Sequence, residues 1–124
     1  MNEQHGYQDL IVWKKSLDLT VEIYRATETF PSRELFGLVS QMRRASVSIP
    51  SNIAEGYRRK LPGDYLHFIR IAYGSTSELE TQLILAKRLS FLSENVYKNI
   101  SSTLDEISRM LNRLATVLSK RLHI

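Results

Sequence analysis

The stretch Gln41-Met-Arg-Arg-Ala-Ser-Val-Ser-Ile-Pro-Ser-Asn-Ile-Ala-Glu-Gly56 decides how this chain folds. Its apolar side chains recur every three or four residues, which places them on one face of a helix, and a polar stripe runs beside them at the same spacing. Pro50 lies in the middle of the stretch. Because proline has no N–H for the carbonyl four residues earlier, we expect the helix to bend or break there. The apolar stripe comprises Leu35, Leu38, Val39, Met42, Ala45, Ile49 and Ile53, and the polar stripe comprises Gln41, Arg44, Ser48, Asn52 and Glu55.

Helical patterns also fill the rest of the chain. The first helix is expected over residues 9–30, the central helix over 33–60, the third over 65–89, and the fourth after an N-cap at Ser93. Short links between them predict an all-α fold, an antiparallel up-down-up-down four-helix bundle with a Pro-kinked second helix. We expect one domain over residues 1–124, with residues 1–8 as a frayed lead-in. The inward face of the first helix is assigned to Leu10, Trp13, Leu17, Val21 and Tyr24.

The last two helices have wide apolar faces. The fourth follows a heptad seam, and the third has apolar residues on more than one side. This width favours self-association, because monomers rarely leave large apolar patches in water; the alternative is a broad core in a short bundle. Within the third helix, Gly74 suggests a close approach of a neighbouring backbone at Gly74-Ser75. The heptad seam comprises Ile100, Leu104, Ile107, Leu111, Leu114 and Leu118.

The bulk composition restricts the class of protein. The chain has 124 residues, 43% of them hydrophobic, and no cysteine, which excludes disulfides and thiolate metal sites and fits the cytoplasm. No apolar run is long enough for a transmembrane helix, so no membrane association is expected. The net charge is +4, and residues 32–61 hold six basic and two acidic side chains. A basic patch of this kind attracts phosphate backbones or acidic proteins, although a solvated helix end gives the same pattern.

Catalytic and metal-binding patterns are missing from the sequence. Neither His5, His67 nor His123 has a glutamate three residues before it, so the Glu-x-x-His pairs of a di-iron bundle are absent. We expect no cofactor, no metal and no enzyme activity. Glu55 and Glu78 could form an acid–base pair, but this interpretation is much less favoured. The favoured interpretation is a structural polar network between the second and third helices. That network would comprise Arg44, Asn52, Glu55, Ser75 and Glu78.

Nucleic acid is the remaining candidate ligand. Basic side chains before and after the proline supply charge for phosphates, and an adjacent tyrosine supplies a ring on which a base can stack. If Arg44 pairs with Glu55 or Glu78, fewer of these charges stay available. The candidate nucleic-acid-binding residues are Arg43, Arg44, Tyr57, Arg58, Arg59 and Lys60.

Several motifs resemble one bacterial family. They are Leu10-Ile-Val-Trp13, Phe30-Pro31, Phe36-Gly37-Leu38, the central stretch Gln41–Gly56, and Ala72-Tyr-Gly-Ser75 with Glu78-Leu79 and Thr81. Together they resemble the 23S rRNA intervening-sequence proteins. The resemblance implies a four-helix bundle that assembles as a homopentamer, a connection with RNA or the ribosome, and no established catalytic residues. A fold-level analogy with the basic accessory proteins of retroelements adds a second possibility, an accessory or scaffold role with a protein partner.

Overall fold

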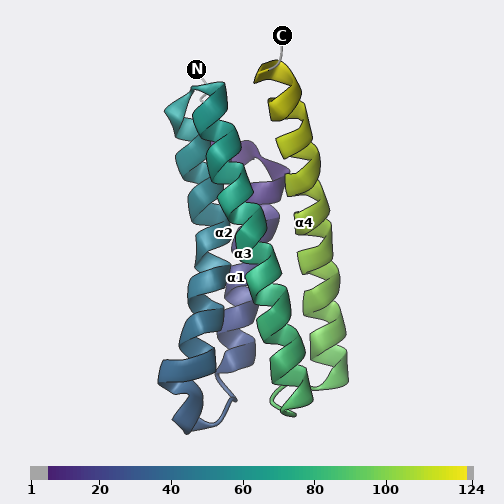
Figure 1. The fold of residues 1–124 in the computed structure, drawn as a ribbon. Helices are drawn as coiled ribbons and strands as arrows, with labels where there is room; N and C mark the ends of the chain where they lie inside the picture. The colour runs from purple at the N-terminus through teal and green to yellow at the C-terminus, as the bar shows by residue number, and fades with distance from the viewer. Residues whose placement is uncertain (1–5, 123–124) are drawn as a thin grey trace.

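Four α-helices make up most of the described part of the chain. The computed structural model describes residues 6–122, and these contain α1 (Ile11–Thr27), α2 (Ser40–Arg59), α3 (Pro62–Arg88) and α4 (Glu94–Leu122), with no strand among the described residues. The predicted all-α class is therefore confirmed. Figure 1 shows the four helices side by side, with both ends of the described chain at the same end of the bundle. We call this end the terminal end.

The helix register follows from a few contacts. Ser48 of α2 meets Ser75 of α3 through their hydroxyl oxygens, 2.8 Å apart. Nearer the terminal end, Gly56 of α2 lies against Phe68 of α3. Residue numbers thus rise along α2 while they fall along α3. The α2–α3 contact is also the most extensive between any two elements of the described chain.

The core confirms most of the predicted apolar faces. The α4 seam is buried throughout, except for the half-buried Leu114. The α2 stripe is buried except for Leu35, which precedes the α-helix and is 47% exposed. At the start of α4, the Ser93 hydroxyl accepts a hydrogen bond from the Val96 N–H at 3.1 Å, which confirms the predicted N-cap.

The predicted inward face of α1 is wrong for three of its five residues, while Leu10 and Trp13 are half-buried and pack against the core. Leu17, Val21 and Tyr24 are each more than 40% exposed. The buried face includes small hydroxyl residues, which can enter a core because their hydroxyls donate to carbonyls of the same helix. Thr27, for example, donates to the Ile23 carbonyl at 2.7 Å. The residues buried on α1 are Val12, Ser16, Leu19, Thr20, Ile23 and Thr27.

Helix α2 continues through Pro50, so the chain does not break there, and a bend at Pro50 stays a prediction. Proline leaves the Ser46 carbonyl, four residues earlier, without its usual N–H donor. The Thr20 hydroxyl of α1 lies 2.9 Å from this carbonyl oxygen and 2.9 Å from the Ser16 carbonyl oxygen of its own helix, so its one hydrogen is shared between the two acceptors. A side chain from the neighbouring helix thus replaces the hydrogen bond that Pro50 removes.

The backbone irregularity lies earlier, at Gly37. This residue has φ −112° and ψ −110° inside a π-helical turn, Leu35–Val39, so the segment expected to be helical from residue 33 is not regular helix until Ser40. The Glu34 carboxylate accepts a hydrogen bond from the Leu38 N–H at 3.3 Å across this turn. The turn places Phe36 outward, with 93% of its surface exposed.

The close helix approach also lies elsewhere than predicted. A Cβ atom added to Gly74 would meet no atom of a neighbouring helix within 4 Å, so of the predicted pair Gly74-Ser75 only Ser75, whose hydroxyl meets that of Ser48, lies at a helix contact. At Gly56, however, an added Cβ would lie 2.7 Å from the Cβ of Phe68. Glycine at position 56 therefore sets how closely α2 and α3 can pack near the terminal end.

The amino-terminal lead-in is partly ordered. Residues Tyr7–Asp9 form a 3-10 turn, and the Tyr7 ring lies 5.2 Å from the Trp13 ring. The frayed lead-in expected over residues 1–8 stays a prediction. Residues 1–5, which include His5, lie outside the described residues, as does His123.

Candidate nucleic-acid interface

Arg43 is held by α1. Its Nε donates to the Thr27 hydroxyl at 3.0 Å, and a terminal guanidinium nitrogen donates to the Tyr24 carbonyl at 3.3 Å. The guanidinium also lies over the Tyr24 ring, 4.6 Å from its centre. These contacts place a cation at the carbonyl end of α1, where the helix dipole favours positive charge. Arg43 therefore has a structural role in joining α1 to α2.

Arg44 is exposed and does not join the predicted polar network. Within residues 6–122 it has no ion pair or hydrogen bond, so pairing with Glu55 or Glu78 is not observed. Glu78 is likewise exposed on α3, and no ion pair or hydrogen bond to it occurs in the described chain. Arg44 and Glu78 therefore do not join this network, whereas Glu55 pairs with Arg59, which also lies 3.9 Å from Asp64 of α3.

The uncharged half of that network is present. The Asn52 amide donates to the Ser48 hydroxyl at 2.9 Å and to the Ser48 carbonyl at 2.8 Å. The Ser48 hydroxyl in turn meets that of Ser75, which also donates to the Ile71 carbonyl at 3.3 Å. Asn52 and Ser75 thus belong to one hydrogen-bonded seam between α2 and α3, and Ser48 connects them.

The residues around the end of α2 are engaged to different degrees. The Arg58 guanidinium lies over the Tyr7 ring, 5.3 Å from its centre, but Arg58 stays exposed. The Tyr57 ring packs edge-on against Tyr65 of α3, with ring centres 5.8 Å apart. Tyr57 is therefore a packing residue at this end of the bundle. Lys60 follows α2 in a left-handed backbone conformation, φ 65°, and is exposed.

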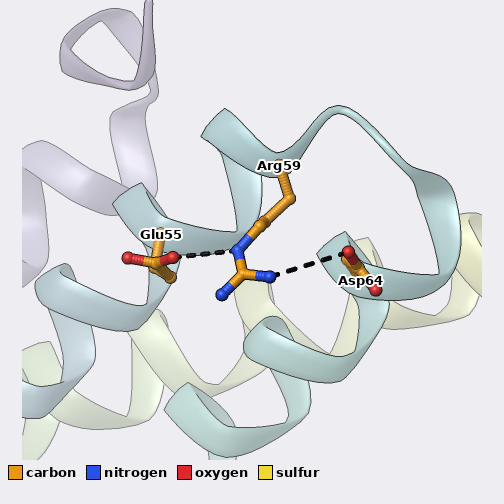
Figure 2. A network of polar contacts seen from close by, with 3 residues as sticks. All are labelled: Glu55, Arg59 and Asp64. Atoms are coloured by element: carbon orange, nitrogen blue, oxygen red, sulfur yellow. Dashed lines mark hydrogen bonds and ion pairs between the residues drawn. The ribbon is translucent and has the colours of Figure 1, made fainter.

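Arg59 is the most constrained of the candidate cations. Figure 2 shows it between two carboxylates: its Nε lies 2.9 Å from Glu55, one turn earlier on α2, and a terminal nitrogen lies 3.9 Å from Asp64 on α3. The same guanidinium lies over the Phe68 ring, 5.0 Å from its centre. Its charge is largely compensated, so Arg59 contributes less to an anion-binding surface than Arg58 or Lys60.

The six candidate residues do not form one patch. Arg44 and Arg58 are fourteen residues apart on one helix, which separates them by roughly 21 Å along the axis at about 1.5 Å per residue. Arg43 and Arg44 lie in the half of α2 nearer its start. Arg58, Arg59 and Lys60 lie at the terminal end, where α2 turns into α3 (Figure 1).

Lys120 and Arg121 at the end of α4 join this second group, whereas Arg109 and Arg113 lie earlier in the helix and Arg109 pairs with Asp105 at 2.9 Å. None of these four residues was predicted from the sequence. Residues 109–122 of α4 hold four basic side chains and no acidic one, and this segment ends at the terminal end (Figure 1). Burial raises the pKa of Tyr65 of α3, and the nearby Tyr57 raises it further. Arg121 of α4 is close enough to Tyr65 to act in the opposite direction and lower this pKa, although by less. The four residues are Arg109, Arg113, Lys120 and Arg121.

A carboxylate pair for acid–base chemistry is not assembled. The Ser48–Ser75 contact fixes the α2–α3 register, and in that register Glu55 and Glu78 are displaced along the bundle by about ten residues, roughly 15 Å. The described residues also contain no cluster of three or more His, Asp or Glu side chains that could hold a metal ion. None of the helices over residues 6–122 is long and apolar enough to cross a membrane.

Comparison with known proteins agrees with this architecture. The chain is similar to a solved structure described as a protein of unknown function from the S23 ribosomal protein family of Bacteroides thetaiotaomicron VPI-5482, with 26% sequence identity and a TM-score of 0.77. The match covers 85% of this chain and 98% of that one. No curated protein matches the chain. The family model of the 23S rRNA-intervening sequence proteins matches residues 8–113, so the chain belongs to the 23S rRNA-intervening sequence protein family.

Proposed function

We propose that this protein is a non-enzymatic, homo-oligomeric bundle that binds RNA or another nucleic acid through its terminal end. The proposal rests on the exposed cations that α2, α3 and α4 bring together at this end. We define the terminal basic surface by the residues Arg58, Lys60, Arg70, Lys120 and Arg121, all of them exposed.

The charge of this surface is available to a ligand. The two carboxylates nearest to it in the α2–α3 turn, Glu55 and Asp64, already pair with Arg59. Lys60, Arg70 and Lys120 have no ion pair within residues 6–122. Exposed cations of this kind bind phosphates by releasing counterions, which gives affinity that falls with salt and depends little on sequence. The family's description, which names 23S rRNA, supports RNA as the ligand.

Self-association is the second part of the proposal. The outward stripe of α1 formed by Leu17, Val21 and Tyr24 leaves apolar surface uncovered, and Ile84 and Leu85 do the same on α3. Such surface favours contact with further copies. We infer an antiparallel up-down-up-down bundle as the repeating unit and a homopentamer as the assembly. Each copy would repeat the terminal basic surface, so that several weak contacts add by avidity.

Two charge-reversal variants test the binding surface. Arg58→Glu with Lys60→Glu changes the terminal end, whereas Arg33→Glu with Arg88→Glu makes the same change of net charge at the opposite end, where both residues are exposed. We expect the first variant to weaken binding to all RNA sequences alike and to flatten the dependence of affinity on salt, and the second to bind nearly as the wild type. Equal effects of the two variants would show that only total charge matters and would overturn the assignment of the surface.

A protein-interaction scaffold is the second candidate function. It is favoured by Phe36, whose ring is 93% exposed beside the irregular backbone of Gly37. Aromatic side chains presented in this way are typical anchors at protein interfaces. A pulldown from nuclease-treated extract that recovers one stoichiometric protein with the wild type, but not with Phe36→Ser, would favour the scaffold over RNA binding.

A further inference from the structure

A groove of about 600 Å³ lies between α3 and α4, on the half of the bundle that carries the terminal end. It lies apart from the candidate nucleic-acid-binding residues predicted from the sequence, and α3 and α4 run side by side there (Figure 1). Its volume is within the range of small-molecule sites, roughly 300–1,000 Å³. The side chains relevant here are Arg70 and Tyr73 from α3, and Asn112, Thr116, Ser119 and Lys120 from α4.

The charge of the groove selects an anion. Arg70 and Lys120 line it from opposite helices, and none of the described residues that line it is a carboxylate. Neither cation has an ion pair within residues 6–122. The hydroxyls of Thr116 and Ser119 add hydrogen-bond donors beside them. A phosphate between the two helices would therefore meet positive charge and neutral donors only.

The rest of the lining suits a base. Tyr73 presents an aromatic ring that is 39% exposed, and the Asn112 amide offers both donors and an acceptor in the same groove. Aromatic rings bind bases by stacking, and amides read their hydrogen-bonding edges, but both require a base that is unpaired. A duplex keeps its bases inside, and packed helices whose axes lie about 8–10 Å apart leave no room for it between them.

We propose that the α3–α4 groove binds unpaired nucleotides of single-stranded RNA, with phosphate at Arg70 and Lys120 and a base on Tyr73. This inference rests on the proposed nucleic-acid function and makes it narrower. The terminal basic surface supplies charge that both duplex and single strand can use, whereas the groove supplies the preference for a single strand.

The test compares a short, unstructured, fluorescently labelled RNA with the duplex formed from the same strand and its complement. We expect the wild-type assembly to bind the single strand at least about fivefold more tightly, as one stacked base contributes. Tyr73→Leu should remove that preference, and Tyr73→Phe should retain it because the ring remains. Unchanged oligomer size and helical content of the two variants serve as controls for folding.

Arg70 belongs to both the terminal basic surface and the groove, and it provides a second readout, of the phosphate contact alone. Arg70→Ala should lower the slope of log affinity against log salt for the single strand by about 0.7, the contribution of one phosphate contact. Arg88→Ala is the matched control, since Arg88 is an exposed arginine of the same helix at its opposite end. It should leave the slope unchanged.

The outcomes separate the two proposals. Binding of neither RNA at low salt would refute the proposed function itself. Equal binding of duplex and single strand that is still weakened by Arg58→Glu with Lys60→Glu would keep that function and overturn the groove. Competition by a 5′-mononucleotide as strong as that of the labelled strand would also overturn it, because the groove would then bind a free nucleotide.

Discussion

The contact between Thr20 and Ser46 gives a quantitative test of how α2 accommodates its internal proline. The perturbation is Thr20→Val, which keeps the shape of the side chain and removes its hydroxyl. Thr20 is 9% exposed, and its hydroxyl lies 2.9 Å from the Ser46 carbonyl, which Pro50 deprives of its backbone donor. The change removes the side-chain donor of this carbonyl.

The expected magnitude follows from leaving a buried acceptor unpaired. Such a loss lowers the free energy of unfolding by about 1–3 kcal/mol. In a Pro50→Ala background, residue 50 regains an N–H that donates to the Ser46 carbonyl. Thr20→Val should then lower the stability by about 0.5 kcal/mol or less, as for substitutions without a special contact. The two changes should therefore be coupled by about 0.5–3 kcal/mol, whatever the effect of Pro50→Ala alone.

The free energy of unfolding is measured by urea denaturation, followed by circular dichroism, for the wild type, the two single variants and the double variant. All four proteins are compared at one concentration, because assembly would otherwise shift the apparent stability. Thr81→Val is the matched control: its hydroxyl donates to the Ser77 carbonyl at 3.1 Å, but Thr81 is exposed and supplies its own backbone N–H to that turn. We expect little change there. An equal cost of Thr20→Val in the proline and alanine backgrounds would refute the idea that Thr20 replaces the missing donor.

Three further predictions concern stability. Gly56→Ala should lower the free energy of unfolding by about 1–3 kcal/mol in urea denaturation, because its Cβ would lie 2.7 Å from that of Phe68; no loss would show that α2 and α3 separate freely. Gly74→Ala should raise it by about 0.5–1 kcal/mol by the same assay, since nothing lies near an added Cβ; a loss would show that position to be covered in the assembly. Burial raises the pKa of Tyr65 above its ordinary value, so stability present below about pH 10 should fall as the pH rises through the folded-state pKa, and Tyr65→Phe should reduce that fall. An identical pH profile for Tyr65→Phe would contradict the assignment to Tyr65.

The fold was predictable where the apolar pattern is unambiguous. The seam of α4 has one apolar series at heptad spacing, and it is the buried one. Helix α1 carries two series at helical spacing, and the longer apolar side chains of Leu17, Val21 and Tyr24 suggested the wrong one. The buried series contains Ser16 and Thr20, whose hydroxyls donate to the Trp13 carbonyl and to the Ser46 carbonyl. Composition alone cannot show that these hydroxyls have partners inside the core.

The candidate site was predictable only in part, for a reason of topology. Arg58 and Lys60 were found because they adjoin the central stretch. Arg70 and Lys120 lie fifty residues apart in the sequence and meet in one groove only because α4 returns beside α3. Arg43 was included because of its charge, but the structure assigns that charge to the carboxyl end of α1. The pairing of such residues depends on the register between helices, which the sequence does not state.

The close approach of α2 and α3 at Gly56 also bears on the order in which the chain folds. Only Lys60 and Leu61 separate these helices, so bringing them together closes a very short loop at little entropic cost. The residues at their contact include Gly56, which has no side chain, and Ser48 and Ser75, whose short side chains lose little rotamer freedom when they are buried. We expect the α2–α3 hairpin to form early and to hold the amide protons that exchange most slowly with solvent, with α1 and α4 docking onto it afterwards.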